Sequence, residues 1–261
     1  MLKQFDITGK VILITGASSG LGQYFATLLA AQGAKVIITG RRFERLKQLA
    51  KKIKAEGGVA FPFALDVRKA SSINGVIKKI ENKVGQIDVL INNAGLDIRR
   101  NFLDHKVEDW DLVFDTNLRG LCLMAQAVAK HMLKYKVAGK IINVSSGSAR
   151  MVWSGGSPAY MASKAAVSHF TVALANELAP HKIQVNAIAP GGVDTEATHE
   201  LFNSPAGKEF EKKLPLGRYS NFSDLAGPLL LLVSDASAYM LGEIIHVDGG
   251  MSLNRLSLQE V

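Results

Sequence analysis

The sequence predicts an α/β fold, a single doubly wound domain with a seven-stranded parallel sheet and helices on both of its faces. Short runs rich in β-branched residues alternate with longer helical patterns along the chain, as crossover units require. The 261 residues are 48% apolar, which is enough to fill one large core. Because no repeat or low-complexity linker divides the chain, we expect one domain over residues 1–261.

The first half of the chain supplies four of the expected strands and three helices. Strands are predicted at residues 11–15, 35–39, 59–65 and 87–91, since each is a short apolar run typical of a strand buried on both faces. Helices are predicted at residues 21–32, 44–55 and 71–84. Gly33 ends the first helix, and the pair Gly57–Gly58 ends the second.

The second half continues the alternation with one interruption. Helices are predicted at residues 107–135, 159–178 and 223–234, and strands at residues 140–145, 182–188 and 243–247. The polar stretch at residues 195–219 breaks this rhythm, with proline and glycine at four positions. We expect it to be a loop or helical lid beside the ligand site, which lies outside the carboxyl ends of the strands in this fold class.

Composition limits the compartment and the partners. The formal net charge of +8 admits nucleic acid, an acidic membrane surface or an anionic small molecule as partner. The sequence contains no recognised nucleic-acid motif and no apolar run of the ~18 residues that a membrane helix needs, so we expect neither kind of binding. Its single cysteine, Cys122, excludes an internal disulfide and a cysteine metal cluster, so we expect a cytoplasmic protein without a metal site.

A glycine-rich loop follows the first expected strand and runs into a helix. Glycines allow a tight turn and a close approach of the backbone to a pyrophosphate, and the helix offers free N–H groups and a positive dipole end. A purely structural turn is the alternative. The pattern predicts a dinucleotide site made by Gly16, Ser18, Ser19, Gly20, Leu21 and Gly22.

The end of the second expected strand indicates which dinucleotide binds. An acid would bind the ribose 2′-hydroxyl of NAD(H), but Gly40 stands there and is followed by Arg41 and Arg42. Two guanidinium groups suit a 2′-phosphate. NADP(H) is therefore the predicted cofactor, with NAD(H) as the alternative and with two arginines on a solvated helix as the structural explanation.

Catalytic chemistry is suggested by polar residues near the same edge of the expected sheet. Tyr160 and Lys164 lie one helical turn apart, and a nearby ammonium stabilises a phenolate. Ser145 and Ser146 end the fifth strand, where a hydroxyl can hold a substrate oxygen. Asn117 falls inside a long predicted helix, where it is either a relay residue or a tolerated polar one. Together these residues suit proton transfer at a carbonyl or alcohol oxygen.

In this order, the motifs resemble those of the short-chain dehydrogenase/reductase family, over about residues 5–250. Further motifs carry the resemblance: Leu65-Asp66-Val67, Asn92-Asn93-Ala94-Gly95, Pro190-Gly191-Gly192-Val193-Asp194-Thr195 and Val247-Asp248-Gly249-Gly250. The resemblance implies a Rossmann fold and a homodimer or homotetramer packed through the two long helices. It also implies cofactor contacts from Asp66, Val67, Asn93, Ala94, Gly95, Tyr160, Lys164, Pro190, Gly191, Val193 and Thr195.

The resemblance further implies a catalytic tetrad of Asn117, Ser146, Tyr160 and Lys164. Tyr160 would be the general acid in reduction, and Lys164 would lower its pKa and bind the nicotinamide ribose. Ser146 would polarise the substrate carbonyl, with Ser145 and Ser148 as alternatives. Asn117 would hold a water that connects Lys164 to solvent. The chain departs from the family in one respect, because the 14-residue step from Ser146 to Tyr160 is one longer than usual.

The predicted activity is hydride transfer between a nicotinamide and a carbonyl or secondary alcohol, and the candidate substrate residues lie in three variable stretches. They are Arg99, Arg100, Ser148, Trp153, His199 and Phe202. The arginines would bind an anionic group, or they face solvent; Trp153 would stack on the substrate or pack its own loop. The substrate is thus predicted to be a small and possibly anionic carbonyl or alcohol compound.

Two substrate classes stay open beside a generic keto-reductase. Arg41-Arg42 and the basic pair after Gly95 are similar to gluconate 5-dehydrogenases. The chain also resembles β-ketoacyl-carrier-protein reductases, although His181 stands where their carrier-docking arginine is expected. A non-catalytic redox sensor or scaffold is the alternative function, but a sensor needs no Ser–Tyr–Lys proton donor.

Overall fold

The computed structural model, which describes residues 2–152 and 157–253, contains one seven-stranded sheet with the order β3-β2-β1-β4-β5-β6-β7. The strands are β1 (Val11–Ile14), β2 (Lys35–Gly40), β3 (Val59–Ala64), β4 (Val89–Asn92), β5 (Lys140–Val144), β6 (Gln184–Pro190) and β7 (Ile244–Val247). Every neighbouring pair is parallel, so all carboxyl ends lie at one edge of the sheet. The predicted fold class is confirmed.

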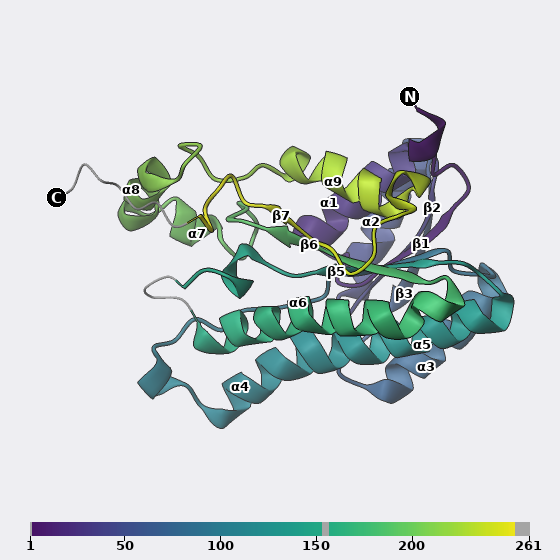
Figure 1. The fold of residues 1–261 in the computed structure, drawn as a ribbon, viewed down its shortest axis with the longest axis horizontal. Coiled ribbons are helices and arrows are strands. Elements are labelled where there is room, and N and C mark those ends of the chain that lie inside the picture. Colours follow the sequence, from purple (N-terminus) through teal and green to yellow (C-terminus); the bar gives the residue numbers. More distant parts are fainter. Residues whose placement is uncertain (1, 153–156, 254–261) are drawn as a thin grey trace.

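Helices cover both faces of the sheet (Figure 1). One layer contains α1 (Gly20–Ala31), α2 (Phe43–Ala55) and α9 (Ala226–Val233), and the other contains α3 (Ala70–Lys83), α4 (Val107–Phe114), α5 (Gly120–Tyr135) and α6 (Pro158–Leu178). Successive strand residues point to opposite faces, so in β1 Ile12 packs into the first layer and Leu13 into the second. Burial on both faces explains why the strands read as unbroken apolar runs.

Two predicted helices differ from those in the structure. The helix expected at residues 107–135 contains a π turn, Asp115–Arg119, between α4 and α5. The helix expected at residues 223–234 begins as a 3₁₀ turn, Phe222–Leu225, and becomes α-helical only in α9. A π turn adds one residue to the helical repeat and often marks a functional site, but a single polar residue such as Asn117 does not predict it.

The segment that follows β6 packs as a small unit at one end of the molecule. It contains α7 (His199–Phe202) and α8 (Pro205–Lys213), which lie at the left of Figure 1. The Phe202 and Tyr219 rings stack with centroids 3.8 Å apart, and Leu214 and Met251 complete a buried cluster around them. Apolar contacts within the segment, and with Met251 after β7, therefore hold it together beside the sheet.

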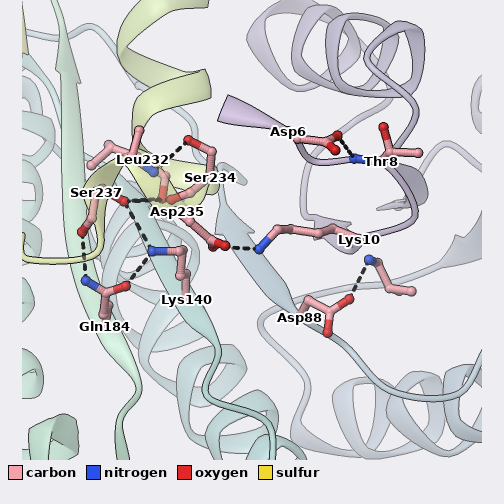
Figure 2. Close-up of polar contacts among 12 residues, drawn as sticks. Asp6, Thr8, Lys10, Asp88, Lys140, Gln184, Leu232, Ser234, Asp235 and Ser237 are labelled. Atoms are coloured by element: carbon pink, nitrogen blue, oxygen red, sulfur yellow. Dashed lines mark hydrogen bonds and ion pairs between the residues drawn. The ribbon is translucent and has the colours of Figure 1, made fainter. Parts of the chain in front are cut away.

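Polar side chains connect elements at the amino-terminal edge of the sheet (Figure 2). Lys10 Nζ lies 2.8 Å from a carboxylate oxygen of Asp235. The buried Lys140 at the start of β5 donates to Gln184 and, at 3.2 Å, to Ser237 Oγ. These contacts connect the starts of β5 and β6 to the 3₁₀ turn Asp235–Ser237, which follows α9.

Of the described helices, none is both long and apolar enough to cross a membrane.

Candidate active site

A cleft of about 840 Å³ opens at the carboxyl edge of the sheet. Nearly all the residues predicted to bind the cofactor line it: Gly16, Ser18, Ser19, Gly20, Leu21, Arg41, Arg42, Asp66, Val67, Asn93, Ala94, Gly95, Tyr160, Lys164, Pro190, Gly191, Val193 and Thr195. The remaining one, Gly22, lies behind the loop. The loops that follow the six strands from β1 to β6 thus converge on one cavity.

The glycine loop packs tightly against the segment after β4. Gly16 has a left-handed φ of +69°, and a Cβ there would lie 2.8 Å from Ala94 Cα. A Cβ on Gly22 would lie 2.5 Å from Asn93 Nδ2, which donates to the Thr15 carbonyl at 2.9 Å. These contacts explain the need for glycine at both positions and leave the start of α1 facing the cleft. The loop fits the pyrophosphate of a dinucleotide, whose negative charge the start of a helix favours.

Basic groups surround the adenosine end expected for such a ligand. Arg42 Nε donates to Ser18 Oγ at 3.2 Å, and its Nη2 donates to Ser19 Oγ. Asp66 accepts two hydrogen bonds from the Arg68 guanidinium, at 3.0 and 2.7 Å, and one from the Arg68 backbone N–H at 3.1 Å, and Arg68 lowers the pKa of Asp66 to about 2. The Asp66 carboxylate is therefore ionised and already paired with a guanidinium.

Tyr160 and Lys164 enter the other end of the cleft from the first turns of α6. Ser157 caps this helix by accepting from the Tyr160 N–H at 3.3 Å. Lys164 Nζ lies 5.7 Å from the centre of the Tyr160 ring and donates to the Val144 carbonyl at 2.8 Å. Burial lowers the pKa of Lys164 to about 8. The ammonium is therefore held at the end of β5, beside the tyrosine.

Taken together, the protein's own groups raise the pKa of Tyr160, and the lowering expected from Lys164 stays a prediction. Burial raises this pKa, and the Asp97 carboxylate raises it further. The Ser146 hydroxyl, which hydrogen-bonds to Tyr160, and the Arg99 guanidinium act in the opposite direction, but burial dominates. Tyr160 is thus a protonated group at neutral pH, which suits a proton donor.

Asn117 does not line the cleft and anchors its wall instead. Its Oδ1 accepts from the Leu96 N–H and its Nδ2 donates to the Leu96 carbonyl, both at 2.8 Å. Nδ2 also lies 3.1 Å from Ser163 Oγ of α6. Gly95 fits between Asn117 and Lys164, since a Cβ there would lie 3.2 Å from Asn117 Oδ1 and 3.5 Å from Lys164 Nζ. Asn117 of the π turn therefore connects the loop after β4 to α6 through hydrogen bonds. The role expected for Asn117 in holding a water stays a prediction.

The two adjacent arginines predicted to bind substrate lie in different places. Arg99 lines the cleft, and its Nε lies 3.2 Å from Asp97 Oδ2. Arg100 is not among the lining residues and pairs with Asp109 at 2.8 Å. Of the two arginines, only Arg99 thus contributes its charge to the cleft, with Asp97 beside it.

Of the other predicted substrate residues, some line the cleft and some do not. Ser148 and Phe202 line the cleft, and the Ser148 N–H donates to Ser146 Oγ at 3.1 Å. His199 lies outside it, is exposed and contacts Asp194 at 3.2 Å. Trp153 lies outside the described residues.

Among the cleft-lining residues that the sequence did not single out are Asp97, Thr116 and Glu196. Thr116 Oγ1 is buried and lacks a hydrogen-bond partner among the described residues. Acids in polar loops usually face solvent, so no pattern marked Asp97 or Glu196. No group of three or more His, Cys, Asp or Glu side chains in the described part of the chain is arranged to hold a metal ion.

Comparisons with known proteins agree with this geometry. A family model described as enoyl-(acyl carrier protein) reductase matches residues 16–252. A short-chain type dehydrogenase/reductase from Mycobacterium marinum has a solved structure that is 38% identical, with a TM-score of 0.93 over 97% of this chain and 99% of that one. The chain belongs to the short-chain dehydrogenase/reductase family. The protein is therefore an oxidoreductase, as the sequence predicted.

Both substrate classes suggested by the sequence occur among relatives of this dehydrogenase/reductase. The 3-oxoacyl-[acyl-carrier-protein] reductase FabG of Thermotoga maritima is 40% identical over 94% of this chain and 98% of its own. A gluconate 5-dehydrogenase from Burkholderia cenocepacia J2315, solved in complex with NADP and tartrate, is 34% identical, with a TM-score of 0.93 over 97% of this chain and 99% of that one. The predicted NADP(H) cofactor is the one that this solved relative contains.

Proposed function

We propose that this protein is an NADP(H)-dependent dehydrogenase/reductase that interconverts a small hydroxy acid and the corresponding keto acid. The observation that carries the proposal is the distribution of charged and proton-donating side chains between the two ends of the cleft. Arg41 and Arg42 lie at one end, and Tyr160, Lys164 and Arg99 lie at the other. One cavity thus offers a site for a 2′-phosphate and a proton donor beside a cation for a substrate carboxylate.

The residues present fit a dinucleotide. The glycine loop and the start of α1 would hold the pyrophosphate, and Arg41 and Arg42 would hold the 2′-phosphate. Lys164 would bind the nicotinamide ribose at the catalytic end. When bound, NADPH supplies the hydride that a carbonyl carbon accepts.

The chain's own residues would handle the proton and the oxygen. In reduction, the Tyr160 hydroxyl donates its proton to the substrate oxygen as the carbon gains the hydride, so the carbonyl becomes an alcohol and Tyr160 becomes a phenolate. Ser146, which hydrogen-bonds to Tyr160, would donate to the same oxygen and polarise the carbonyl. Lys164 would stabilise the phenolate until a proton returns. Oxidation runs these steps in reverse.

The Asp97–Arg99 pair supports a polar anionic substrate. The Arg99 side chain is about one-third exposed, and its Nε contacts the Asp97 carboxylate. A substrate carboxylate could therefore bind the guanidinium beside Asp97 or in its place. Asp97 accepts hydrogen bonds and would suit substrate hydroxyls. Burying an acyl chain against this ion pair would cost free energy, which favours a hydroxy acid over a fatty acyl thioester. A 3-oxoacyl carrier protein is the second candidate, favoured by the 40% identity to the Thermotoga maritima reductase.

The two arginines provide a matched test. Arg99→Gln should raise KM for a keto acid about tenfold, the loss of one partly exposed charge-assisted contact, and should leave KM for a neutral ketone unchanged. Arg100→Gln should change neither, because Arg100 pairs with Asp109 outside the cleft. Steady-state rates with NADPH measure both. Equal effects of the two substitutions, or a preference of the wild type for neutral ketones, would contradict an anionic substrate.

Three further features belong to the same proposal. Residues 195–219 would act as the lid, because Phe202 and Glu196 of this segment line the cleft. Two protomers would pack through α5 and α6 into a homodimer, and two dimers into a homotetramer. The single cysteine fits the reducing cytoplasm. Neither nucleic acid nor a membrane is part of the proposed activity.

A further inference from the structure

Glu196 connects the two sides of the cleft. It follows β6, and its carboxylate reaches Arg45 in the first turn of α2, with Oε2–Nη1 and Oε1–Nη2 distances of 2.8 and 3.3 Å. The same Oε2 lies 3.8 Å from Nη1 of Arg42. Strands β2 and β6 have β1, β4 and β5 between them, so this contact crosses the cleft above the centre of the sheet.

Arg42 is shared between this carboxylate and the glycine loop. Its Nε and Nη2 donate to the hydroxyls of Ser18 and Ser19, which leaves Nη1 toward Glu196. Arg42 and Glu196 line the same cavity. Arg45 lowers the pKa of Glu196 by a hydrogen bond and by its charge, so Glu196 is ionised at neutral pH. A full negative charge therefore lies next to the arginine assigned to the 2′-phosphate.

We propose that Glu196 sets how strongly the enzyme prefers NADP(H) over NAD(H), because its carboxylate competes with the ribose 2′-phosphate for Arg42. This inference rests on the proposed use of NADP(H). The phosphate carries close to two negative charges, and NAD(H) has an uncharged hydroxyl in its place. Repulsion between Glu196 and a 2′-phosphate thus acts on NADP(H) alone, since the pyrophosphate is common to both cofactors, and Arg45 offsets it by neutralising the carboxylate. The pair Arg45–Glu196 adjusts the selectivity that Arg41 and Arg42 provide.

Two substitutions should have opposite effects. Glu196→Gln keeps the size of the side chain and removes its charge, so NADPH should bind about three- to tenfold more tightly. Arg45→Gln leaves Glu196 unneutralised, so NADPH should bind more weakly by a similar factor. NADH affinity should stay within about twofold in both variants, because NADH has no 2′-phosphate beside Arg42 and its pyrophosphate is held by the glycine loop. Fluorescence titrations with NADPH and NADH give all four constants, and rising salt should shrink the NADPH effects.

Glu200→Gln is the matched control, because Glu200 is exposed on α7 of the same segment and carries the same charge. It should leave both affinities unchanged. An unchanged NADPH-to-NADH ratio in Glu196→Gln would overturn the inference. Equal weakening of both cofactors would also overturn it, since Glu196 would then fasten the cleft without regard to the phosphate. The wild-type ratio is a separate result: equal affinity for the two cofactors contradicts the proposed NADP(H) preference, whatever Glu196→Gln does.

Discussion

Tyr160→Phe should lower the rate of hydride transfer by about 10²–10⁴-fold, the range for loss of a general acid–base. Only the hydroxyl is removed, and the ring keeps its packing on α6 beside Lys164. Steady-state kinetics in both directions measure the rate. NADPH titration and thermal unfolding should give wild-type values, because the hydroxyl contributes the proton and no large part of the fold.

The control for this substitution is Tyr239→Phe, in which a fully exposed tyrosine far from the cleft loses the same atom. This variant should keep full activity. If Tyr160→Phe kept activity within a few-fold of the wild type while binding cofactor normally, another group would have to supply the proton.

Lys164→Met should lose at least about 10²-fold in rate and should also bind NADPH more weakly, because Lys164 has two proposed roles. Methionine fills much of the same volume but removes the ammonium that donates to the Val144 carbonyl. Parallel measurements of kcat, KM and NADPH affinity separate the two roles. Thermal unfolding shows how far the unpaired carbonyl destabilises the fold.

A loss of rate with unchanged NADPH affinity would contradict the cofactor-binding role of Lys164 and would still support its role in proton transfer. Near-normal activity in a folded Lys164→Met protein would contradict both. The burial of Lys164 makes the charge costly to keep, and a residue without a function there would be expected to be apolar.

Short apolar runs and the glycine loop were sufficient to predict the sheet and one wall of the cleft. β1 and β4 read as apolar runs because each is buried on both faces, and parallel pairing then brings every strand-end motif to one edge. Gly16 and Gly22 could be predicted because glycines between a strand and a helix are a recognisable signal in the sequence. The structure adds that Gly22 packs against Asn93 behind the loop.

Residues whose role depends on side-chain direction could not be predicted in the same way. Arg99 and Arg100 are equivalent in the sequence, and only the loop geometry turns the first into the cleft and the second toward Asp109. Glu196 has its closest partner, Arg45, 151 residues away, beyond the reach of any local pattern. The direction expected for the pKa of Tyr160 came from its spacing to Lys164, whereas burial, which no local pattern shows, is the largest influence on this pKa and raises it.

The pH profile of alcohol oxidation tests most directly whether Tyr160 and Lys164 act as one proton-transferring pair. Oxidation needs the Tyr160 phenolate, so kcat/KM should rise with pH in the wild type. In the protein alone, burial holds the pKa of Tyr160 above its usual value. When the oxidised cofactor is bound, we expect its cationic nicotinamide, together with the Lys164 ammonium, to stabilise the phenolate and to bring the midpoint well below the free value of about 10. In Lys164→Met the ammonium is gone, the phenolate is less stable, and the midpoint should move upward by about one pH unit or more. The same midpoint in both proteins, or a rate that falls as the pH rises, would contradict the pairing.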